Sequence, residues 1–371
     1  MDTRRINELF SASYAEARQK FLHAATARGL AVDSYELPLA GAQGETLATD
    51  VVLDGPEGVS KLLVVLSGVH GVEGFCGSAV QSGMLRLEGA LRPRELEDAA
   101  TLYVHAVNPY GFSHLRRVTQ ENVDPNRNFI DFAQPLPVNP GYAEIHDLLL
   151  PPEWPPRPEV SAALDAYREQ HGARGMQRAI GLGQYAFADG MFFGGLEPTW
   201  SNRTFRRILR RYASEARQIG AIDIHTGLGP YGVGERIFAS NDNGVLERAA
   251  RWWGPLTSVH TGSSTSIPMT GPIQYGLFEE CPDAEHVGIC LEFGTWPNER
   301  VMAALRAEHW LHRRGSDDAA QAAAIKRDLK DAFYPEADDW KRMIWEQGSQ
   351  ACLQALRGLQ DAGRTTTAVA A

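Results

Sequence analysis

Three residues that are distant in the chain could together bind a catalytic metal ion. His70 and Glu73 lie three positions apart in Gly-Val-His-Gly-Val-Glu-Gly, so an imidazole and a carboxylate can close on one ion. His225 follows 155 positions after His70, in Ile-Asp-Ile-His-Thr-Gly. Two histidines and one glutamate, with the fourth position left to water, are a known ligand set of catalytic zinc. The sequence therefore predicts one zinc ion per chain at these three residues; manganese, iron or cobalt fit the same ligands less commonly.

A carboxylate is also expected inside a buried strand. Glu292 interrupts the apolar segment 288–293, where an unpaired carboxylate costs several kcal/mol. Such a residue needs a partner, for example a cation or metal-bound water, so beside a metal site Glu292 is a candidate general base. Asp223, two positions before His225, is a candidate hydrogen-bond partner for a ligand imidazole, and equally a strand-end residue that caps the next turn.

Arginine and amide side chains are concentrated in residues 108–129, directly after a strand-like segment. Among them are Arg116, Arg117, Asn126 and Arg127. A guanidinium binds a carboxylate through two parallel hydrogen bonds, so this loop is a candidate carboxylate-binding surface. The alternative, a solvated loop whose arginines pair with local acidic residues, is equally compatible with this stretch alone.

The segment before His70, residues 62–67, is apolar and β-branched, which is typical of a buried strand in a parallel sheet. Residues 102–107, 221–225 and 288–293 have the same character, and helical sequence lies between them. This alternation predicts an α/β fold with a mixed, mostly parallel central sheet and helices on both faces. The predicted metal ligands would then lie beyond the carboxyl ends of strands, where open α/β sheets place their sites.

Elements outside this core surround it on both sides in the sequence. The periodicity of residues 5–28 predicts one amphipathic helix, and residues 34–39 and 46–53 predict a hairpin. Residues 298–360 look helical throughout and are expected to pack over the sheet edge or over a partner subunit, so a homo-oligomer is compatible with the sequence. The tail, residues 365–371, is expected to fray.

We expect the whole chain, residues 1–371, to form a single catalytic domain with a core over 55–315. An insertion over about 134–200 begins in a proline-rich stretch and ends in the aromatic and glycine-rich residues 183–195. Its composition suggests a lid or a pocket wall. The helical segment described above forms a C-terminal extension of this domain.

The composition restricts the classes of function. A net charge of −10 and a pI near 5.6 argue against nucleic acid as a partner. The N-terminus lacks the apolar segment of a signal peptide, and no apolar run is long enough for a membrane span, so the cytoplasm is the expected compartment. The four cysteines show no metal-binding spacing and are expected to be buried thiols.

Two other classes, dinucleotide-dependent enzymes and serine hydrolases, are excluded because their motifs are incomplete or missing. Residues 227–232, Gly-Leu-Gly-Pro-Tyr-Gly, fit the glycine pattern of dinucleotide-binding loops. That pattern needs a helix to open there, whereas residues 236–239 look like a strand. No Gly-x-Ser-x-Gly motif exists, which leaves a serine hydrolase without its usual nucleophile turn.

Together these motifs resemble the zinc carboxypeptidase A-like metallopeptidase superfamily, which includes the aspartoacylase and succinylglutamate desuccinylase branch. The resemblance covers residues 60–295, and the wording of the segments around His70 and His225 is most similar to a bacterial branch of unsettled substrate. It implies the fold of zinc carboxypeptidases and phosphorylase-like hydrolases. It also implies that His70, Glu73 and His225 are the metal ligands.

The resemblance further implies roles for the other candidates. In Asp-Pro-Asn-Arg-Asn-Phe, Asn126 and Arg127 match the residues that hold the substrate's terminal carboxylate. Arg117 matches an arginine that polarises the scissile carbonyl, although the adjacent Arg116 could fill that role. Glu292 matches the catalytic glutamate, and Tyr275 is the best candidate for the family's mobile, substrate-binding tyrosine.

These inferences predict a zinc-dependent hydrolase that cleaves an amide bond next to a substrate carboxylate, by Glu-assisted attack of zinc-bound water. It would act on a small peptide as a metallocarboxypeptidase, or on an N-acyl amino acid as a deacylase. The alternative is a catalytically inactive, metal-dependent binding protein for peptide or acidic ligands. The presence of Glu292 favours the enzyme, because a binding protein could discard that carboxylate without losing its metal.

Overall fold

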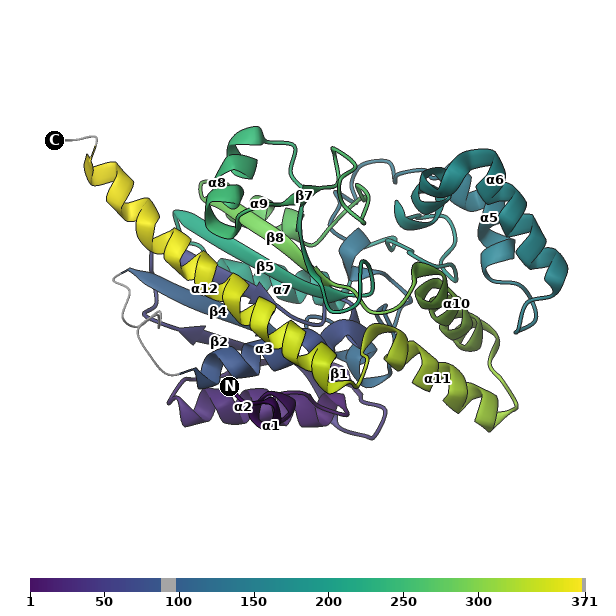
Figure 1. The fold of residues 1–371 in the computed structure, drawn as a ribbon, viewed down its shortest axis with the longest axis horizontal. Helices are drawn as coiled ribbons and strands as arrows, with labels where there is room; N and C mark the ends of the chain where they lie inside the picture. Colours follow the sequence, from purple (N-terminus) through teal and green to yellow (C-terminus); the bar gives the residue numbers. More distant parts are fainter. Residues whose placement is uncertain (88–97, 369–371) are drawn as a thin grey trace.

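The computed structural model describes residues 1–87 and 98–368, which form a sheet flanked by helices (Figure 1). Eight strands of the described chain pair in the order β1-β2-β4-β3-β5-β8-β6-β7. The strands β4, β3, β5 and β8 run parallel, whereas β1, β2 and β6 pair antiparallel with their inner neighbours. The predicted mixed, mostly parallel sheet is therefore confirmed. The strands are β1 Asp33–Ala40, β2 Thr46–Asp54, β3 Lys61–Leu66, β4 Ala99–His105, β5 Gln218–Thr226, β6 Gly234–Phe238, β7 Thr257–Ser258 and β8 Glu285–Phe293.

Helices cover both faces of the sheet because successive side chains of a strand point to opposite sides. In β3, Leu63 and Val65 join one apolar cluster, and Leu62 and Val64 join another. The first cluster lies under α2, α3 and α12, with α12 running across the face of the sheet (Figure 1). The second lies under α7 and α9. These helices are α2 Tyr14–Ala27, α3 Gly74–Arg86, α7 Trp200–Tyr212, α9 Gln274–Glu280 and α12 Asp338–Ala368.

The single N-terminal helix predicted over residues 5–28 is wrong. The structure has α1 Thr3–Asn7 and then α2, which begins after Ser13. The Ser13 hydroxyl accepts a hydrogen bond from the Glu16 amide, and the Glu16 carboxylate accepts one from the Ala12 amide at 2.7 Å. The Ser13 hydroxyl caps the first turn and the Glu16 carboxylate holds the residue before the cap, which fixes the start of α2; the Ser-x-x-Glu spacing was present in the sequence.

The C-terminal segment is also interrupted. It forms α10 Asn298–Arg314, α11 Ala319–Phe333 and α12, with breaks at Gly315 and at Pro335. α12 packs on the face of the sheet, not over its edge, because Trp340, Ile344 and Trp345 are buried in the first cluster. The tail continues this helix through Ala368, and residues 369–371 lie outside the described chain.

The remaining helices include α5 Pro140–Leu149 and α6 Pro158–Gly181 of the predicted insertion, and α8 Asn243–Trp253. α5 and α6 gather with α10 and α11 at one end of the molecule (Figure 1). The boundaries proposed for the core, the insertion and the extension stay predictions. Within residues 1–87 and 98–368, no helix combines the length and the apolar composition that crossing a bilayer requires.

Candidate active site

The first two candidate ligands lie in the turn that leads from β3 into α3. A short helical turn, η1 Gly71–Glu73, carries Glu73 and directly follows His70. Gly71 is required because a Cβ there would lie 2.0 Å from the carbonyl carbon of Gly111. The Gly71 amide also donates to the carbonyl of Arg117 at 3.1 Å. The turn that carries Glu73 is therefore packed directly against the arginine-rich loop.

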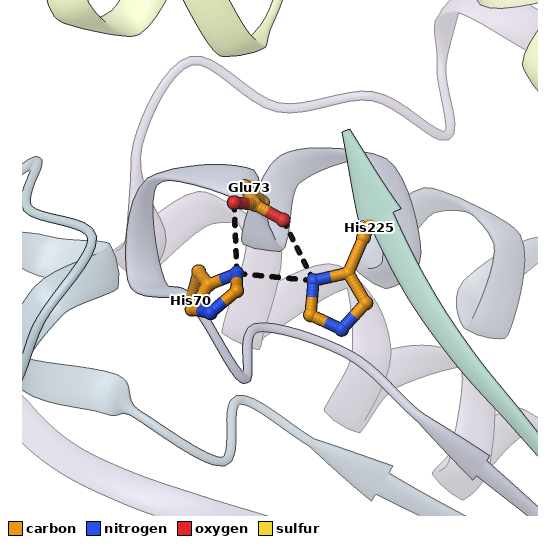
Figure 2. Close-up of side chains that lie close together, drawn as sticks. All are labelled: His70, Glu73 and His225. Carbon is orange, nitrogen blue, oxygen red and sulfur yellow. Dashed lines mark hydrogen bonds and ion pairs between the residues drawn. The ribbon is translucent and has the colours of Figure 1, made fainter. Parts of the chain in front are cut away.

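His225 reaches the same point from the carboxyl end of β5. Its Nδ1 lies 2.8 Å from Glu73 Oε2, and His70 Nδ1 lies 2.9 Å from Glu73 Oε1. The two Nδ1 atoms are 3.1 Å apart, so all three side chains converge on one point (Figure 2). All three residues are 3% exposed or less. This is the one such cluster of histidine, cysteine and acidic residues found in the described chain that could hold a metal ion.

The donor set fits a zinc ion. Nitrogen ligands at about 2.0–2.1 Å in tetrahedral coordination are about 3.3 Å apart, close to the observed separation of the two Nδ1 atoms. The outer ring nitrogens face carboxylates: His70 Nε2 lies 3.2 Å from Asp124 Oδ1, and His225 Nε2 lies 2.7 Å from Asp223 Oδ2. Such carboxylates orient ligand imidazoles and increase their basicity. The position of Asp223 agrees with its expected contact to a ligand imidazole.

The charges of this cluster favour an anionic Glu73. Burial alone would raise the pKa of Glu73, but the adjacent His70 and His225 outweigh it and lower that pKa. Burial would lower the pKa of His225, yet Asp223 and Glu73 raise it well above its ordinary value. The carboxylates around His225 therefore favour a positive charge at this point. A divalent cation would supply such a charge among the same donors.

Glu292 lies beside His225 on the neighbouring strand. The two are register partners in the parallel pair β5 and β8, so the strands' hydrogen bonds fix their relative level. Glu292 is 7% exposed, and its Oε1 accepts a hydrogen bond from the Leu228 amide at 3.0 Å. Burial, with the negative charge of Glu73 added, raises the pKa of Glu292 to about 8. A carboxylate with a raised pKa is a stronger proton acceptor.

Arg117 bridges the arginine-rich loop to the metal cluster. Its Nη1 donates to Glu73 Oε1 at 3.0 Å and its Nε donates to Asp124 Oδ2 at 3.1 Å. Its Nη2 has no hydrogen-bond acceptor among the described residues and remains able to donate. Burial would lower the pKa of Arg117, but Asp124 and Glu73 raise it, so its positive charge is held beside the cluster.

Arg116 requires a correction. Its side chain points away from the site, with Nε donating to Glu308 Oε1 at 2.7 Å and Nη2 donating to Asn122 Oδ1 at 3.0 Å. It is 1% exposed and does not line the cavity that holds the other candidates. Arg116 therefore contacts the interior of the protein, where it supports the loop, and the substrate contact expected for it is not available from this position.

This buried pair leads to a stability prediction. Burial alone would raise the pKa of Glu308, but Arg116 and Lys326 outweigh it and lower the pKa to about 2. Glu308→Gln leaves the Arg116 charge without its counter-ion, which should lower the free energy of unfolding by roughly 3–5 kcal/mol. Because the folded pKa is depressed, the ionised pair stabilises the protein above about pH 4.5 and this contribution is lost as the pH falls towards 2.

Chemical denaturation at pH 7 would measure this effect, with Glu153→Gln as the matched control. Glu153 pairs with Arg157 on the surface, where both side chains are more than half exposed. The control should leave the unfolding midpoint unchanged. An equal response of the two variants would show that the Arg116 pair adds nothing to stability.

Asn126 and Arg127 lie on the turn Pro125–Arg127, directly after Asp124, whose carboxylate contacts His70. The Asn126 Oδ1 accepts from the Ile273 amide at 2.8 Å, which leaves its Nδ2 free to donate. Arg127 is 3% exposed, and its guanidinium donates to the carbonyls of Gly181 and Asn126. No carboxylate of the described chain lies within ion-pair distance of it, and burial lowers its pKa.

One cavity of about 460 Å³ connects these groups, and this volume suits a small molecule. It is lined by all of the candidates except Arg116: His70, Glu73, Arg117, Asn126, Arg127, His225, Tyr275 and Glu292. Tyr275 lies on α9 and is 42% exposed, so its ring faces both the cavity and solvent. The structure brings these side chains together, whereas their catalytic and binding roles stay predictions.

Two residues of the site were missed from the sequence. Asp124 contacts His70 and Arg117, and it lies in the same Asp-Pro-Asn-Arg motif as Asn126, so the motif itself was the available signal. The Phe192 ring lies 5.2 Å from the Arg117 guanidinium carbon and 5.6 Å from that of Arg127. Nothing in the sequence around Phe192 indicates this contact.

The rejected dinucleotide loop, residues 227–232, leads into β6 and opens no helix.

Comparison with one solved structure confirms the predicted fold, and two further structures show a weaker similarity. Bovine thrombin-activatable fibrinolysis inhibitor, in complex with tick carboxypeptidase inhibitor, is 10% identical with a TM-score of 0.50, over 95% of this chain and 98% of that chain. A protein of Shewanella amazonensis SB2B, described provisionally as a metallopeptidase, is 14% identical with a TM-score of 0.39, over 80% of this chain and 92% of that chain. A protein of Shewanella frigidimarina NCIMB 400, described provisionally as a succinylglutamate desuccinylase/aspartoacylase, is 17% identical with a TM-score of 0.38. The match covers 78% of this chain and 73% of that chain.

The sequence comparisons give a family and no described activity. No protein among the curated sequences matches the chain. The sequence model of one family matches residues 10–347, which is most of the chain, and that family is described as a protein of unknown function. The chain therefore belongs to the DUF2817 family.

Proposed function

We propose that this protein is a zinc-dependent hydrolase that cleaves an amide bond next to a carboxylate of its substrate. One observation carries the proposal. A single cavity joins a cluster able to bind a metal, a buried carboxylate beside it, and a buried guanidinium that lacks a carboxylate partner in the described chain. A binding protein has no need for the buried Glu292, because that carboxylate is costly to keep ionised away from water.

His70, Glu73 and His225 would hold the zinc ion, which when bound supplies Lewis acidity to water and to the substrate carbonyl. Glu292 accepts the proton of the attacking water and then delivers it to the nitrogen of the leaving amine. Arg117 donates from Nη2 to the oxyanion that develops on the scissile carbonyl. In other enzymes one such donor contributes roughly 3–4 kcal/mol to transition-state stabilisation.

Asn126 and Arg127 position the substrate. The Asn126 Nδ2 and the Arg127 guanidinium donate to its carboxylate, which supplies the anionic partner that Arg127 lacks. Because the turn Pro125–Arg127 is fixed against the metal cluster through Asp124, the held carboxylate determines which amide bond lies beside Glu292. Tyr275 would close over the substrate from α9. N-acyl amino acids and small peptides both carry the required carboxylate.

The experiment is a comparison of two forms of one substrate. Wild-type protein loaded with zinc should hydrolyse an N-acyl amino acid with a free carboxylate much faster than the same compound capped as a primary amide. In Arg127→Ala, kcat/KM for the capped form and kcat/KM for the uncapped form should become similar. The loss of kcat/KM for the free carboxylate should be about 30-fold or more, mainly through KM, since truncating one partner of a buried charge pair costs at least roughly 2 kcal/mol.

The exposed Arg168 lines the same cavity and provides the matched control. Arg168→Ala should keep the preference of the wild type for the free carboxylate. Equal rates on capped and uncapped substrate in the wild type would refute the assigned carboxylate site. Binding of zinc and of N-acyl amino acids without any turnover would favour the inactive binding protein instead.

A further inference from the structure

The predicted insertion contributes a wall of the active-site cavity. The C-terminal half of α6 lines the cavity through Met176, Gln177 and Ile180, and α10 lines it through Met302 and Leu305. The two helices lie near each other at one end of the molecule (Figure 1). Their apolar side chains belong to one cluster, and Arg168 of α6 lies 3.8 Å from Glu299 of α10.

α6 is also bound to the loop that enters α9. Arg174 and Gln177 together donate to four backbone carbonyls of this loop, and Arg174 Nη1 also donates to Gln177 Oε1 at 2.9 Å. We call these two side chains and their acceptors the latch. The acceptors are Gly262 O at 2.9 Å, Ser264 O at 2.9 Å and Ser266 O at 3.4 Å for Arg174, and Thr265 O at 2.8 Å for Gln177.

The latch joins two walls of the cavity. Gln177 lines it from α6, and the loop lines it through Ser266, Ile267 and Met269. Beyond the latch the contact continues, because a Cβ at Gly181 would lie 3.2 Å from Ile267 Cδ1. A glycine with φ of +72°, Gly172, breaks α6 just before Arg174 and so directs the second half of the helix towards the loop.

We propose that α6 roofs the active site and that the latch holds this roof closed. The substrate is then a small N-acyl amino acid. With the latch closed, a polypeptide cannot leave the cavity between α6 and the loop, and the side that reaches solvent at Tyr275 is left for the small substrate to enter. This inference rests on the proposed function and narrows its substrate class. A cavity of about 460 Å³ is consistent with it, since it accommodates a small molecule as a whole.

The chemistry of the roof selects an apolar acyl group. Along the described parts of α6 and α10, the cavity lining is apolar apart from Gln177, Asn298, Arg168 and Glu299. Arg168 and Glu299 have opposite charges and lie 3.8 Å apart, so neither offers an unpaired charge to the substrate. An acyl group with a second carboxylate would lack a cationic partner there, which disfavours it.

The activity test uses substrates that share one C-terminal residue. These are an N-hexanoyl amino acid, an N-succinyl amino acid, and peptides of two, four and eight residues. In the wild type, kcat/KM should fall by about tenfold or more from the hexanoyl compound to the eight-residue peptide, and the succinyl compound should also be poor. In the double variant Arg174→Ala/Gln177→Ala, the ratio of kcat/KM for the hexanoyl compound to kcat/KM for the eight-residue peptide should fall towards one.

Arg178→Ala is the control, because Arg178 is an exposed arginine of the same helix outside the latch. It should keep the wild-type selectivity. Equal kcat/KM on short and long substrates in the wild type, or unchanged selectivity in the double variant, would overturn the inference while leaving the proposed function intact. If no substrate were hydrolysed, the proposed function would fail, and a second measurement would still test the roof.

That measurement uses Cys290, which lines the cavity and is the most exposed of the four cysteines; because burial raises the pKa of its thiol well above the ordinary value, all proteins are labelled at the same alkaline pH. Its alkylation by iodoacetamide and by a maleimide carrying a polyethylene glycol chain needs no metal and no turnover. The rate with the polyethylene glycol maleimide, divided by the rate with iodoacetamide, should be low in the wild type and in Arg178→Ala. This ratio should rise in the double variant. Cys290→Ala identifies the labelled thiol. A ratio that is the same in all three proteins would overturn the roof.

Discussion

Glu292→Gln is expected to remove hydrolysis while leaving zinc bound. Glutamine has the same shape, and its amide oxygen can still accept the hydrogen bond that the Leu228 amide donates to Oε1 at 3.0 Å. It cannot accept a proton from water, so the general-base contribution, roughly a factor of 10²–10⁴, should be lost from kcat. Zinc should remain because its predicted ligands are His70, Glu73 and His225, none of which is altered.

The measurement is kcat together with the zinc content of the purified variant. Glu235→Gln is the matched control, since Glu235 is the register partner of Glu292 on β6 and hydrogen-bonds to Thr257 and Thr265 outside the cavity lining. This control should turn over at the wild-type rate. Full activity of Glu292→Gln would show that another group takes the proton. Loss of zinc from it would show that Glu292 helps to hold the metal.

His225→Ala should abolish stoichiometric zinc binding and, with it, activity. The substitution removes one of three converging donors, and its Nδ1 is the atom that lies 2.8 Å from Glu73 and 3.1 Å from His70 Nδ1. Asp223→Asn should have a smaller effect. It keeps the imidazole but weakens the contact at His225 Nε2, and residues in such positions typically change metal affinity by about 10–100-fold.

Elemental analysis and zinc titration of the purified proteins would rank these variants by zinc content and by zinc affinity. His260→Ala is the control, because His260 lines the same cavity but bonds to the Ala239 carbonyl at 2.8 Å, away from the cluster. It should bind one zinc per chain, as the wild type should. Wild-type zinc content in His225→Ala would be incompatible with the assigned site. The wild type should also gain thermal stability with added zinc, since a ligand that binds only the folded state stabilises it.

The parts of the site that follow local rules could be predicted from the sequence. The apolar run that forms β3 and the three-residue spacing of His70 and Glu73 are local patterns, so they placed two ligands beyond a strand end. The parallel sheet then required the end of β5, with His225, to lie nearby. Glu292 was found because a carboxylate in an apolar strand is costly wherever the strand lies.

The choice between Arg116 and Arg117 could not be made in the same way. The two are adjacent in an irregular loop without periodicity, so no pattern says which one points inward. The choice is made by Glu308, which is 192 positions from Arg116 and binds it from α10. The latch could not be predicted from the sequence either, because the carbonyls that bind Arg174 lie about 90 positions later in the chain. Such partners are determined by tertiary packing.

The pairing of β5 with β8 has a consequence for how this protein can change. His225 and Glu292 are register partners, so main-chain hydrogen bonds hold the proposed metal ligand and the proposed proton acceptor at one level. The loop that carries the latch carbonyls and the helix that carries Tyr275 both belong to the chain between these two strands. Substitutions in the loop that carries the latch carbonyls, and at Tyr275, can alter which molecule enters without moving the reacting groups. Leu228 and Ile273 lie in the same part of the chain but hold Glu292 and Asn126, so they should be kept. Libraries for new substrates should therefore vary residues 262–269 and Tyr275 and keep both strands intact.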